Sequence, residues 1–435
     1  MNSGISWLLI GVVSDNLIPL SSYPSYLTCI SQQCWPRITM AVRQISEQIY
    51  TVGVIDWNRR IFDELVPLPE GTSYNSYYVK GSEKTALIDT SDPSKQEEFI
   101  GNLIRLGINR LDYIVINHAE QDHAGCLPML LELFPGAKVC CSQKCQELLA
   151  LLLDVPAGRC QVVNSGDSIN LGDRTLSFIS APWVHWPETM MTYCPEEEIL
   201  FSCDLFGSHY ATSDLFVQDM AREEILAKRY YGEIMMPFRS SIVKYMSQLK
   251  EMKISIIAPS HGPLVKPASL ILDLYEEWTS DRVKNLVLIP YVSMHGSTSQ
   301  MMNFLTELLL ERGVGVKPFK VTNPDTGALA MELVDAATVV FATPTVLFGP
   351  HPDMVSVAYL ANLIKPKTRY ASIIGSYGWG GKTVDTLTSM ISHIKAELLS
   401  PVYIQGAPNE KAQVELQALA NSIAEKHSQD TLVIK

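Results

Sequence analysis

Four metal-binding side chains lie within six residues of one another in the run Asn117–Gly125. They are His118, Glu120, Asp122 and His123. The apolar stretch Leu111–Ile116 precedes the run and predicts a buried strand, so the four side chains fall on the loop that leaves it. Four ligands on one loop are too many for a single closed site, but they can face two neighbouring metals.

Three further candidate ligands follow at His185, Asp204 and His261. A single His or Asp is more often a structural or surface residue than a ligand. Seven of them in one spaced pattern meet the ligand count and ligand type that a metal site requires. The second of the four side chains, Glu120, is a carboxylate and therefore a hard oxygen donor. A histidine at this position would instead be a nitrogen donor. These residues together predict a two-metal centre.

Three loops in the second half of the chain form another group of candidates. The loop Ser293–Ser299 enters a predicted helix directly, and its hydroxyls and free backbone N–H groups suit a phosphate. No Gly-x-Gly-x-x-Gly motif and no Walker lysine accompany it, so a dinucleotide or ATP fits poorly. The second loop is Thr343–Gly349, and the third, Gly375–Gly381, carries two aromatic residues among glycines.

The three loops follow strand ends, where such sheets bind ligands, and together they predict a mononucleotide with a planar ring, FMN. Trp379 and Tyr377 are candidates for stacking on that ring, with ordinary packing as the alternative. The residues predicted to contact FMN are Ser293, Met294, His295, Gly296, Ser297, Thr298, Thr343, Pro344, Thr345, Gly349, Ser376, Tyr377, Gly378, Trp379 and Gly380.

Composition limits the classes of protein that the chain can belong to. A length of 435 residues suits two domains, and 47% hydrophobic with 18% charged residues indicates a globular protein. The net charge of −12 argues against nucleic acid as a partner and weakly favours a basic one. Nine cysteines include no Cys-x-x-Cys pair, so no rubredoxin-type iron site is encoded. We expect reduced thiols in a cytoplasmic protein.

Residues 1–39 differ from the rest of the chain. The apolar stretch Trp7–Val13 is much shorter than the roughly 20 residues of a membrane span, and no Lys or Arg precedes it. Met40 then opens a stretch typical of a cytosolic start. We expect residues 1–39 to be a disordered extension or a misassigned start, with a cleaved signal as the weaker alternative, and we expect no contact with a membrane.

The predicted strands and helices that must position these candidate residues follow two different patterns. Residues 40–283 alternate short strands, Gly- and Pro-rich turns and occasional helices, which predicts sheets covered by helices. Residues 284–435 begin with a continuous apolar run typical of a parallel strand buried on both faces. Five predicted strands alternate there with helices, which indicates a doubly wound α/β domain of flavodoxin size and order.

These motifs together resemble the flavodiiron proteins over residues 40–435. The pattern His118-x-Glu120-x-Asp122-His123 with His185, Asp204 and His261 matches the diiron ligand set of that family at every position, and Gly375–Gly381 matches its flavin loop. The resemblance implies an N-terminal metallo-β-lactamase-like αββα sandwich over residues 40–283. It implies a flavodoxin-like doubly wound parallel sheet over residues 284–435.

The resemblance also implies how the ligands divide. His118, Glu120 and His185 would hold one iron and Asp122, His123 and His261 the other, with Asp204 bridging them. Hydrolases of this fold carry His at the position of Glu120, and a carboxylate there favours redox-active iron over zinc. Three carboxylates and one hydroxide would neutralise a diferrous pair, which matters because unpaired buried charge is costly.

The function implied is an oxidoreductase that passes electrons from a separate donor through FMN to the diiron centre, which reduces O₂ to water, NO to N₂O, or both. Rubredoxin or a reduced deazaflavin coenzyme would be the donor, and the chain would form a head-to-tail homodimer or a dimer of dimers. Two alternatives stay open: a dizinc hydrolase of the metallo-β-lactamase fold, and a flavin electron carrier or redox sensor.

Three residues near the metal motifs have open roles. His209 and Tyr210 follow Asp204 closely and are candidates for proton or hydrogen-bond donors beside the metals. Cys126, just beyond the first run, is expected to be a packed thiol and not a ligand.

Overall fold

The computed structural model describes residues 42–322 and 325–434. The expectations for residues 1–39 lie outside this part, as do Cys29 and Cys34. In the described ranges no helix combines the length and the apolar character needed to cross a membrane. The seven cysteines of these ranges are free thiols, and six are buried, in agreement with the expectation of reduced, packed thiols.

The first sheet has seven strands in the order β1-β2-β7-β8-β9-β10-β11. Its strands β7 and β8 pair antiparallel, whereas β8, β9, β10 and β11 run parallel. The strands are β1 (Arg43–Ser46), β2 (Ile49–Thr51), β7 (Tyr77–Lys80), β8 (Thr85–Ile88), β9 (Tyr113–Val115), β10 (Lys138–Cys141) and β11 (Cys160–Val162).

The second sheet has five strands in sequence order. They are β12 (Ser168–Asn170), β13 (Thr175–Ser180), β14 (Met190–Cys194), β15 (Ile199–Cys203) and β16 (Ile256–Pro259). Alternate residues of a strand point to opposite faces, and the two faces of the first sheet enter different cores. Val79 and Ile88 join the core between the sheets, while Tyr78 and Leu87 face the helices.

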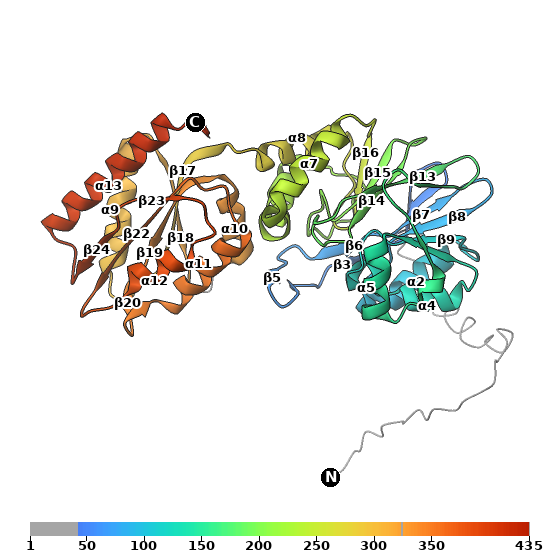
Figure 1. Cartoon of the computed structure of the whole chain (residues 1–435), viewed down its shortest axis with the longest axis horizontal. Coiled ribbons are helices and arrows are strands. Elements are labelled where there is room, and N and C mark those ends of the chain that lie inside the picture. Colours follow the sequence, from blue (N-terminus) through green and yellow to red (C-terminus); the bar gives the residue numbers. More distant parts are fainter. Residues whose placement is uncertain (1–41, 323–324, 435) are drawn as a thin grey trace, which may run out of the picture. The chain divides into compact units, whose positions relative to one another are not determined.

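Helices cover both outer faces of this pair of sheets. On the first sheet lie α2 (Gln96–Arg105), α4 (Leu127–Leu133) and α5 (Gln143–Leu153). On the second lie α6 (Met220–Tyr230), α7 (Arg239–Lys250) and α8 (Ser269–Thr279). Figure 1 shows these helices flanking the strands in blue, green and yellow-green. The result is the predicted four-layered αββα sandwich.

The third sheet is the predicted doubly wound one. Its strands β18 (Gly315–Lys320), β17 (Val283–Tyr291), β19 (Ala336–Ala342), β22 (Tyr370–Tyr377) and β24 (Val402–Gln405) pair in parallel in that spatial order. The chain therefore moves from β17 outward to β18 and then returns to the other side of β17. That reversal is the topological switch point at which such sheets bind ligands.

Helices cover both faces of this sheet, as Figure 1 shows in gold, orange and red. Two of them, α9 (Ser297–Glu311) and α13 (Glu410–Gln429), share one core with Val287 and Val340. The other three are α10 (Thr326–Asp335), α11 (Pro352–Ile364) and α12 (Thr383–Met390), and they pack with Leu288 and Phe341 on the opposite face. Apolar residues on both faces explain why β17 is a continuous apolar run.

Candidate metal centre and flavin cavity

The loop after β9 is held in place by buried hydrogen bonds. Asp89, which follows β8, accepts one from the Asn117 backbone N–H at 2.8 Å and another from the Asn117 amide at 3.0 Å. Thr192 on β14 donates to Asn117 Oδ1 at 2.8 Å. The short helix α3 (Gln121–Ala124) then carries Asp122 and His123. The remaining candidates follow β13, β15 and β16, so strand ends of both sheets supply the cluster.

The first group contains His118, Glu120, His185 and one oxygen of Asp204, with ligand atoms all within 4.8 Å of one another. Glu120 Oε2 lies 2.9 Å from His118 Nε2 and 3.3 Å from His185 Nε2. Asp204 Oδ2 lies 3.4 Å from His185 Nε2 and 3.7 Å from His118 Nε2.

The second group contains Asp122, His123 and His261. Asp122 lies 3.4 Å from His123 Nε2 through Oδ1 and 3.2 Å from His261 Nε2 through Oδ2. The other oxygen of Asp204, Oδ1, lies 3.1 Å from His123 Nε2 and 3.3 Å from His261 Nε2. Asp204 therefore presents one oxygen to each group, which is the arrangement of a bridging carboxylate.

The spacing and the unpaired oxygens both fit bound metal ions. Two donor atoms that each lie about 2.1 Å from one metal, at right angles, are about 3 Å apart, close to the separations in both groups. Both oxygens of Asp122 and Oδ1 of Asp204 are buried without a hydrogen-bond partner in the described structure. Buried carboxylates without partners are costly unless a cation compensates them.

The electrostatics of the cluster point the same way. Burial alone would lower the pKa of His185 and of His261, but contacts with Asp204, and with Glu120 or Asp122, raise these values to about 9 and about 10. Burial alone would raise the pKa of Asp204, yet the surrounding imidazoles hold it well below its usual value. The cluster thus attracts positive charge. Protons supply this charge when no metal is bound, and a metal ion supplies it when it displaces those protons.

The space beside the two groups is small. A cavity of about 20 Å³ lies against both groups and is closed by Phe62, Asp63, Tyr230, Ile234 and His209. This volume exceeds the roughly 10–15 Å³ that one water occupies but is far below the roughly 300–1,000 Å³ of pockets for organic ligands. The cavity therefore has the size of a small molecule and not that of an organic ligand.

Of His209, Tyr210 and Cys126, whose roles the sequence left open, only His209 lies at the metal cavity. The His209 ring lines the metal cavity, where its Nε2 is buried without a partner while Thr72 contacts its Nδ1 at 2.9 Å. Burial, followed by the neighbouring His261, lowers the pKa of His209 well below its usual value, so the ring is neutral. Tyr210 lines a different small cavity beside Arg43. Cys126 is buried and belongs to no metal-binding group of the described residues.

The flavin cavity of about 340 Å³ opens at the carboxyl ends of β17, β19, β22 and β24. Most predicted contacts line it: Ser293, Met294, His295, Ser297, Thr298, Pro344, Thr345, Ser376, Tyr377, Gly378 and Trp379. Trp379 and Met294 are 70% and 51% exposed, so two large apolar side chains at its border lack packing partners. The first N–H groups of α9 have no partner within the helix and suit a phosphate.

Four predicted contacts do not line this cavity. Thr343 is fully buried, where its hydroxyl accepts a hydrogen bond from His351 N, and Gly349 lies in the hairpin of β20 (Thr345–Val346) and β21 (Gly349–Pro350). Gly296 precedes α9 with φ 92°, and Gly380 lines a neighbouring cavity. Sequence reasoning missed Gly406 and Ala407, which line the flavin cavity after β24. Position after a parallel strand was the signal that could have identified them.

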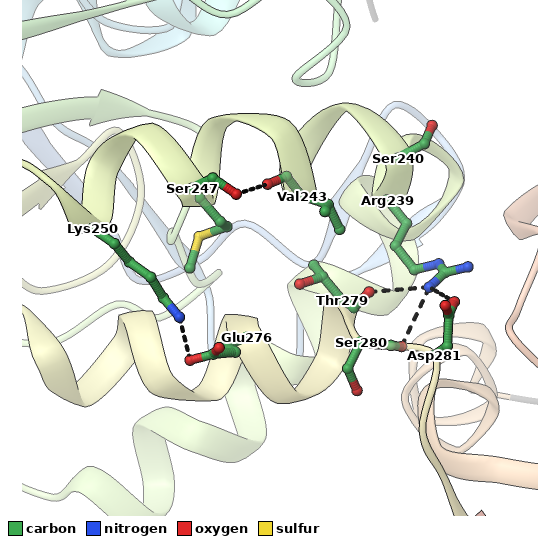
Figure 2. Close-up of a pocket in the computed structure, with 10 residues that line it drawn as sticks. Arg239, Ser240, Val243, Ser247, Lys250, Glu276, Thr279, Ser280 and Asp281 are labelled. Atoms are coloured by element: carbon green, nitrogen blue, oxygen red, sulfur yellow. Dashed lines mark hydrogen bonds and ion pairs between the residues drawn. The ribbon is translucent and has the colours of Figure 1, made fainter. Parts of the chain in front are cut away.

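Another cavity, of about 480 Å³, lies between α7 and α8 and contains none of the predicted site residues. Figure 2 shows that its charged side chains are paired: Lys250 with Glu276 at 2.5 Å, and Arg239 with Asp281 at 2.7 Å. Arg239 also donates to the Thr279 carbonyl oxygen at 3.0 Å. The described residues that line this cavity form no candidate catalytic or metal-binding group.

Comparisons with known proteins match both halves of the chain. The ODP family of beta-lactamases matches residues 72–262, and the flavodoxin family matches residues 289–418. The first match includes all seven candidate metal ligands, and the second includes the three loops predicted to hold the flavin.

Relatives match the chain over nearly its whole length. A nitric oxide reductase from Moorella thermoacetica is 36% identical, and the match covers 82% of this chain and 91% of the relative. The solved structure of rubredoxin oxygen:oxidoreductase from Desulfovibrio gigas is 29% identical with a TM-score of 0.85, covering 88% and 98%. That of the flavodiiron protein from Giardia intestinalis is 28% identical with a TM-score of 0.82, again covering 88% and 98%.

Proposed function

Because the chain belongs to the flavodiiron protein family, we propose that it is an oxidoreductase that reduces O₂ to water, NO to N₂O, or both. Its cofactors are FMN and two non-haem irons. FMN would accept electrons from a separate donor, and the irons would supply them to the gas. The observation that carries this proposal is the Asp204 carboxylate, which presents one oxygen to each of two ligand groups beside a cavity sized for a diatomic gas.

In this proposal each group holds one iron. His118, Glu120 and His185 would hold one, Asp122, His123 and His261 would hold the other, and Asp204 would supply one oxygen to each. Two imidazoles with carboxylates leave coordination positions at which a small molecule can bind. The second nitrogens of two rings are held by hydrogen bonds: His118 Nδ1 contacts Glu188 Oε1 at 2.6 Å and His261 Nδ1 donates to the Ser73 carbonyl oxygen at 2.7 Å. These bonds orient the rings so that Nε2 faces the cluster.

FMN is proposed to bind with its phosphate at Ser297 and Thr298 and its ring beside Tyr377 and Trp379. When bound, the irons and the flavin together store the four electrons that convert O₂ to two waters, and two electrons suffice to convert two NO to N₂O and water. Phe62, Tyr230 and Ile234 limit the room at the metal cavity, which excludes bulk water from the reacting gas. Residues 284–435 are proposed as the flavin domain and residues 40–283 as the metal domain.

Three further features are proposed on the basis of the family. Rubredoxin or a reduced deazaflavin coenzyme is the external donor. The protein forms a head-to-tail homodimer or a dimer of dimers, which brings the flavin of one subunit near the metals of another. The described cysteines are free thiols, which supports a cytoplasmic location.

Metal analysis and rapid kinetics test this function. We expect two irons and one FMN per chain, and fast reoxidation of the reduced protein by O₂ or NO in anaerobic stopped flow, with the ratio of the two rates identifying the preferred gas. Two zincs without iron would favour the dizinc hydrolase. Bound iron without reoxidation by either gas would instead favour an electron carrier or redox sensor.

A further inference from the structure

Glu188 is a buried carboxylate directly behind the metal cluster. It is 2% exposed and lies at the end of the loop that carries His185. Its Oε1 contacts His118 Nδ1 at 2.6 Å and accepts a hydrogen bond from the Ala119 backbone N–H at 3.1 Å. Ser142 holds its backbone by donating to the Glu188 carbonyl oxygen at 2.8 Å. The hydrogen bonds to Ala119 and Ser142 thus keep the Glu188 side chain in contact with His118.

Among the described residues, none of the other three imidazoles of the cluster makes a hydrogen bond to a carboxylate through Nδ1. The Nδ1 of His261 donates to a neutral backbone oxygen, that of Ser73. The ring of His123 lies near Asp89 and Cys203, with ligand atoms within 4.8 Å of one another, but the Asp89 oxygens already accept hydrogen bonds from Asn117. A carboxylate hydrogen bond to a ring nitrogen outside the cluster therefore distinguishes His118 from its neighbours.

We propose that Glu188 is a positioning residue that makes the two irons unequal. A carboxylate that accepts the Nδ1 proton fixes the tautomer of an imidazole and raises the basicity of its other nitrogen. His118 Nε2 is therefore the most strongly donating imidazole nitrogen of the cluster. The iron held by His118, Glu120 and His185 loses its electron more readily than the iron held by Asp122, His123 and His261. Its oxidation removes one electron, and the proton stays between His118 and Glu188.

This inference rests on the proposed diiron function, and iron analysis of the unaltered protein separates the two. Absence of iron would remove both, whereas bound iron leaves the role of Glu188 to be tested by itself. The informative substitution is Glu188→Gln, because the amide oxygen still accepts from His118 and Ala119 while the negative charge is lost. Glu223→Gln is the control, since Glu223 is an equally buried carboxyl (1% exposed) on α6. Because burial raises the pKa of Glu223 to about 7, all variants are compared well above pH 7, where Glu223 also carries its charge.

The experiment is a potentiometric titration followed by EPR of the mixed-valent state, together with ⁵⁷Fe Mössbauer spectra of the reduced holoprotein. For Glu188→Gln we expect two irons and a change of at least about tenfold in the equilibrium for the first oxidation, which corresponds to about 59 mV for one electron. One Mössbauer doublet should change and the other should not. Glu188→Asp, which keeps the charge, should restore most of the potential, and Glu223→Gln should behave as the unaltered protein.

Three results would overturn the inference. The first is an unchanged first potential in Glu188→Gln with both irons bound. The second is an equal change of both Mössbauer doublets, which would mean that Glu188 acts on the whole centre. The third is an equal shift in Glu223→Gln, which would make the effect a general loss of buried charge. If Glu188→Gln does not fold, Glu188→Asp becomes the test. A Glu188→Asp protein that binds both irons but shifts the first potential by about 59 mV would show that the charge of residue 188 is not the cause.

Discussion

The metal centre and the flavin cavity are built in opposite ways. Ligand atoms at the metal centre belong to side chains that are almost fully buried, such as His118 and Asp204, and the adjoining cavity holds about 20 Å³. The flavin cavity holds about 340 Å³ and is bordered by exposed side chains, of which Trp379 is 70% exposed. One region is closed around charged side chains, and the other is open and lined by hydroxyl, glycine and aromatic residues.

The difference follows from what each region must hold. Metal ions need several charged or nitrogen ligands at short distances, so each ligand must be oriented and shielded from water. A flavin needs a flat space, a phosphate-binding turn and access for an electron donor, which loops at strand ends supply. Changes at the metal centre should therefore abolish binding, whereas changes at the flavin cavity should only weaken it.

The largest expected effect is that of Asp204→Ala. This substitution removes the one carboxylate that faces both groups and leaves His123, His185 and His261 without their shared partner. We expect loss of both irons and a fall in O₂ and NO reduction greater than the roughly 10–100-fold typical of changes outside the ligand set. FMN should remain at one per chain. Elemental analysis and the flavin absorbance measure the two outcomes on one sample.

Asp273→Ala is the control, because Asp273 is exposed on α8 and should leave iron and flavin unchanged. Retention of two irons by Asp204→Ala would show that the bridging carboxylate is dispensable. Loss of FMN together with iron would contradict the independence of the two regions.

A smaller effect is expected for Glu120→His, which changes the kind of ligand but not the number. Imidazole in place of carboxylate makes the first group richer in nitrogen, and this favours zinc over iron. We expect the zinc-to-iron ratio of protein grown with both metals to rise and gas reduction to fall accordingly. An unchanged ratio would mean that metal choice depends on residues other than Glu120.

The contrast also explains what sequence reasoning could predict. Strand and helix positions followed from periodicity, because faces such as Tyr78 and Val79 alternate between two cores. The seven candidate ligands were identifiable because metal chemistry needs particular side chains, and the structure brings them together in two groups. Their division around Asp204 came from the family resemblance and agrees with the distances.

The remaining features depend on contacts between distant segments. Nothing in the local sequence indicates that Glu188 contacts His118 across 70 positions, or that His209 faces the metal cavity while Tyr210 faces away. On β22, only the fold explains Gly375, since a Cβ there, at φ 158°, would lie 1.9 Å from the Thr343 carbonyl oxygen. Backbone approach of this kind depends on tertiary structure and not on residue type.

Trp379→Ala tests the open region and should have a moderate effect. Aromatic stacking contributes about 0.5–1.5 kcal/mol, so we expect the Kd for FMN to rise about 2- to 12-fold while iron stays at two per chain. Fluorescence titration of the apoflavoprotein with FMN measures the change. Tyr359→Ala is the control, because Tyr359 is 58% exposed on α11 and does not line the cavity. An unchanged Kd in Trp379→Ala would mean that this ring does not stack on the flavin.

The smallest expected effect is a gain in stability from Leu347→Gly. Leu347 is 89% exposed in the turn between β20 and β21 and has φ 48°, a left-handed conformation that costs most side chains about 1–2 kcal/mol. Glycine adopts it freely but loses more entropy on folding, so we expect a net gain of about 0.5–1 kcal/mol in urea unfolding. Leu151→Gly, at a 78% exposed position inside α5, should instead destabilise by about 1 kcal/mol. Equal losses in both variants would show that the turn is not strained.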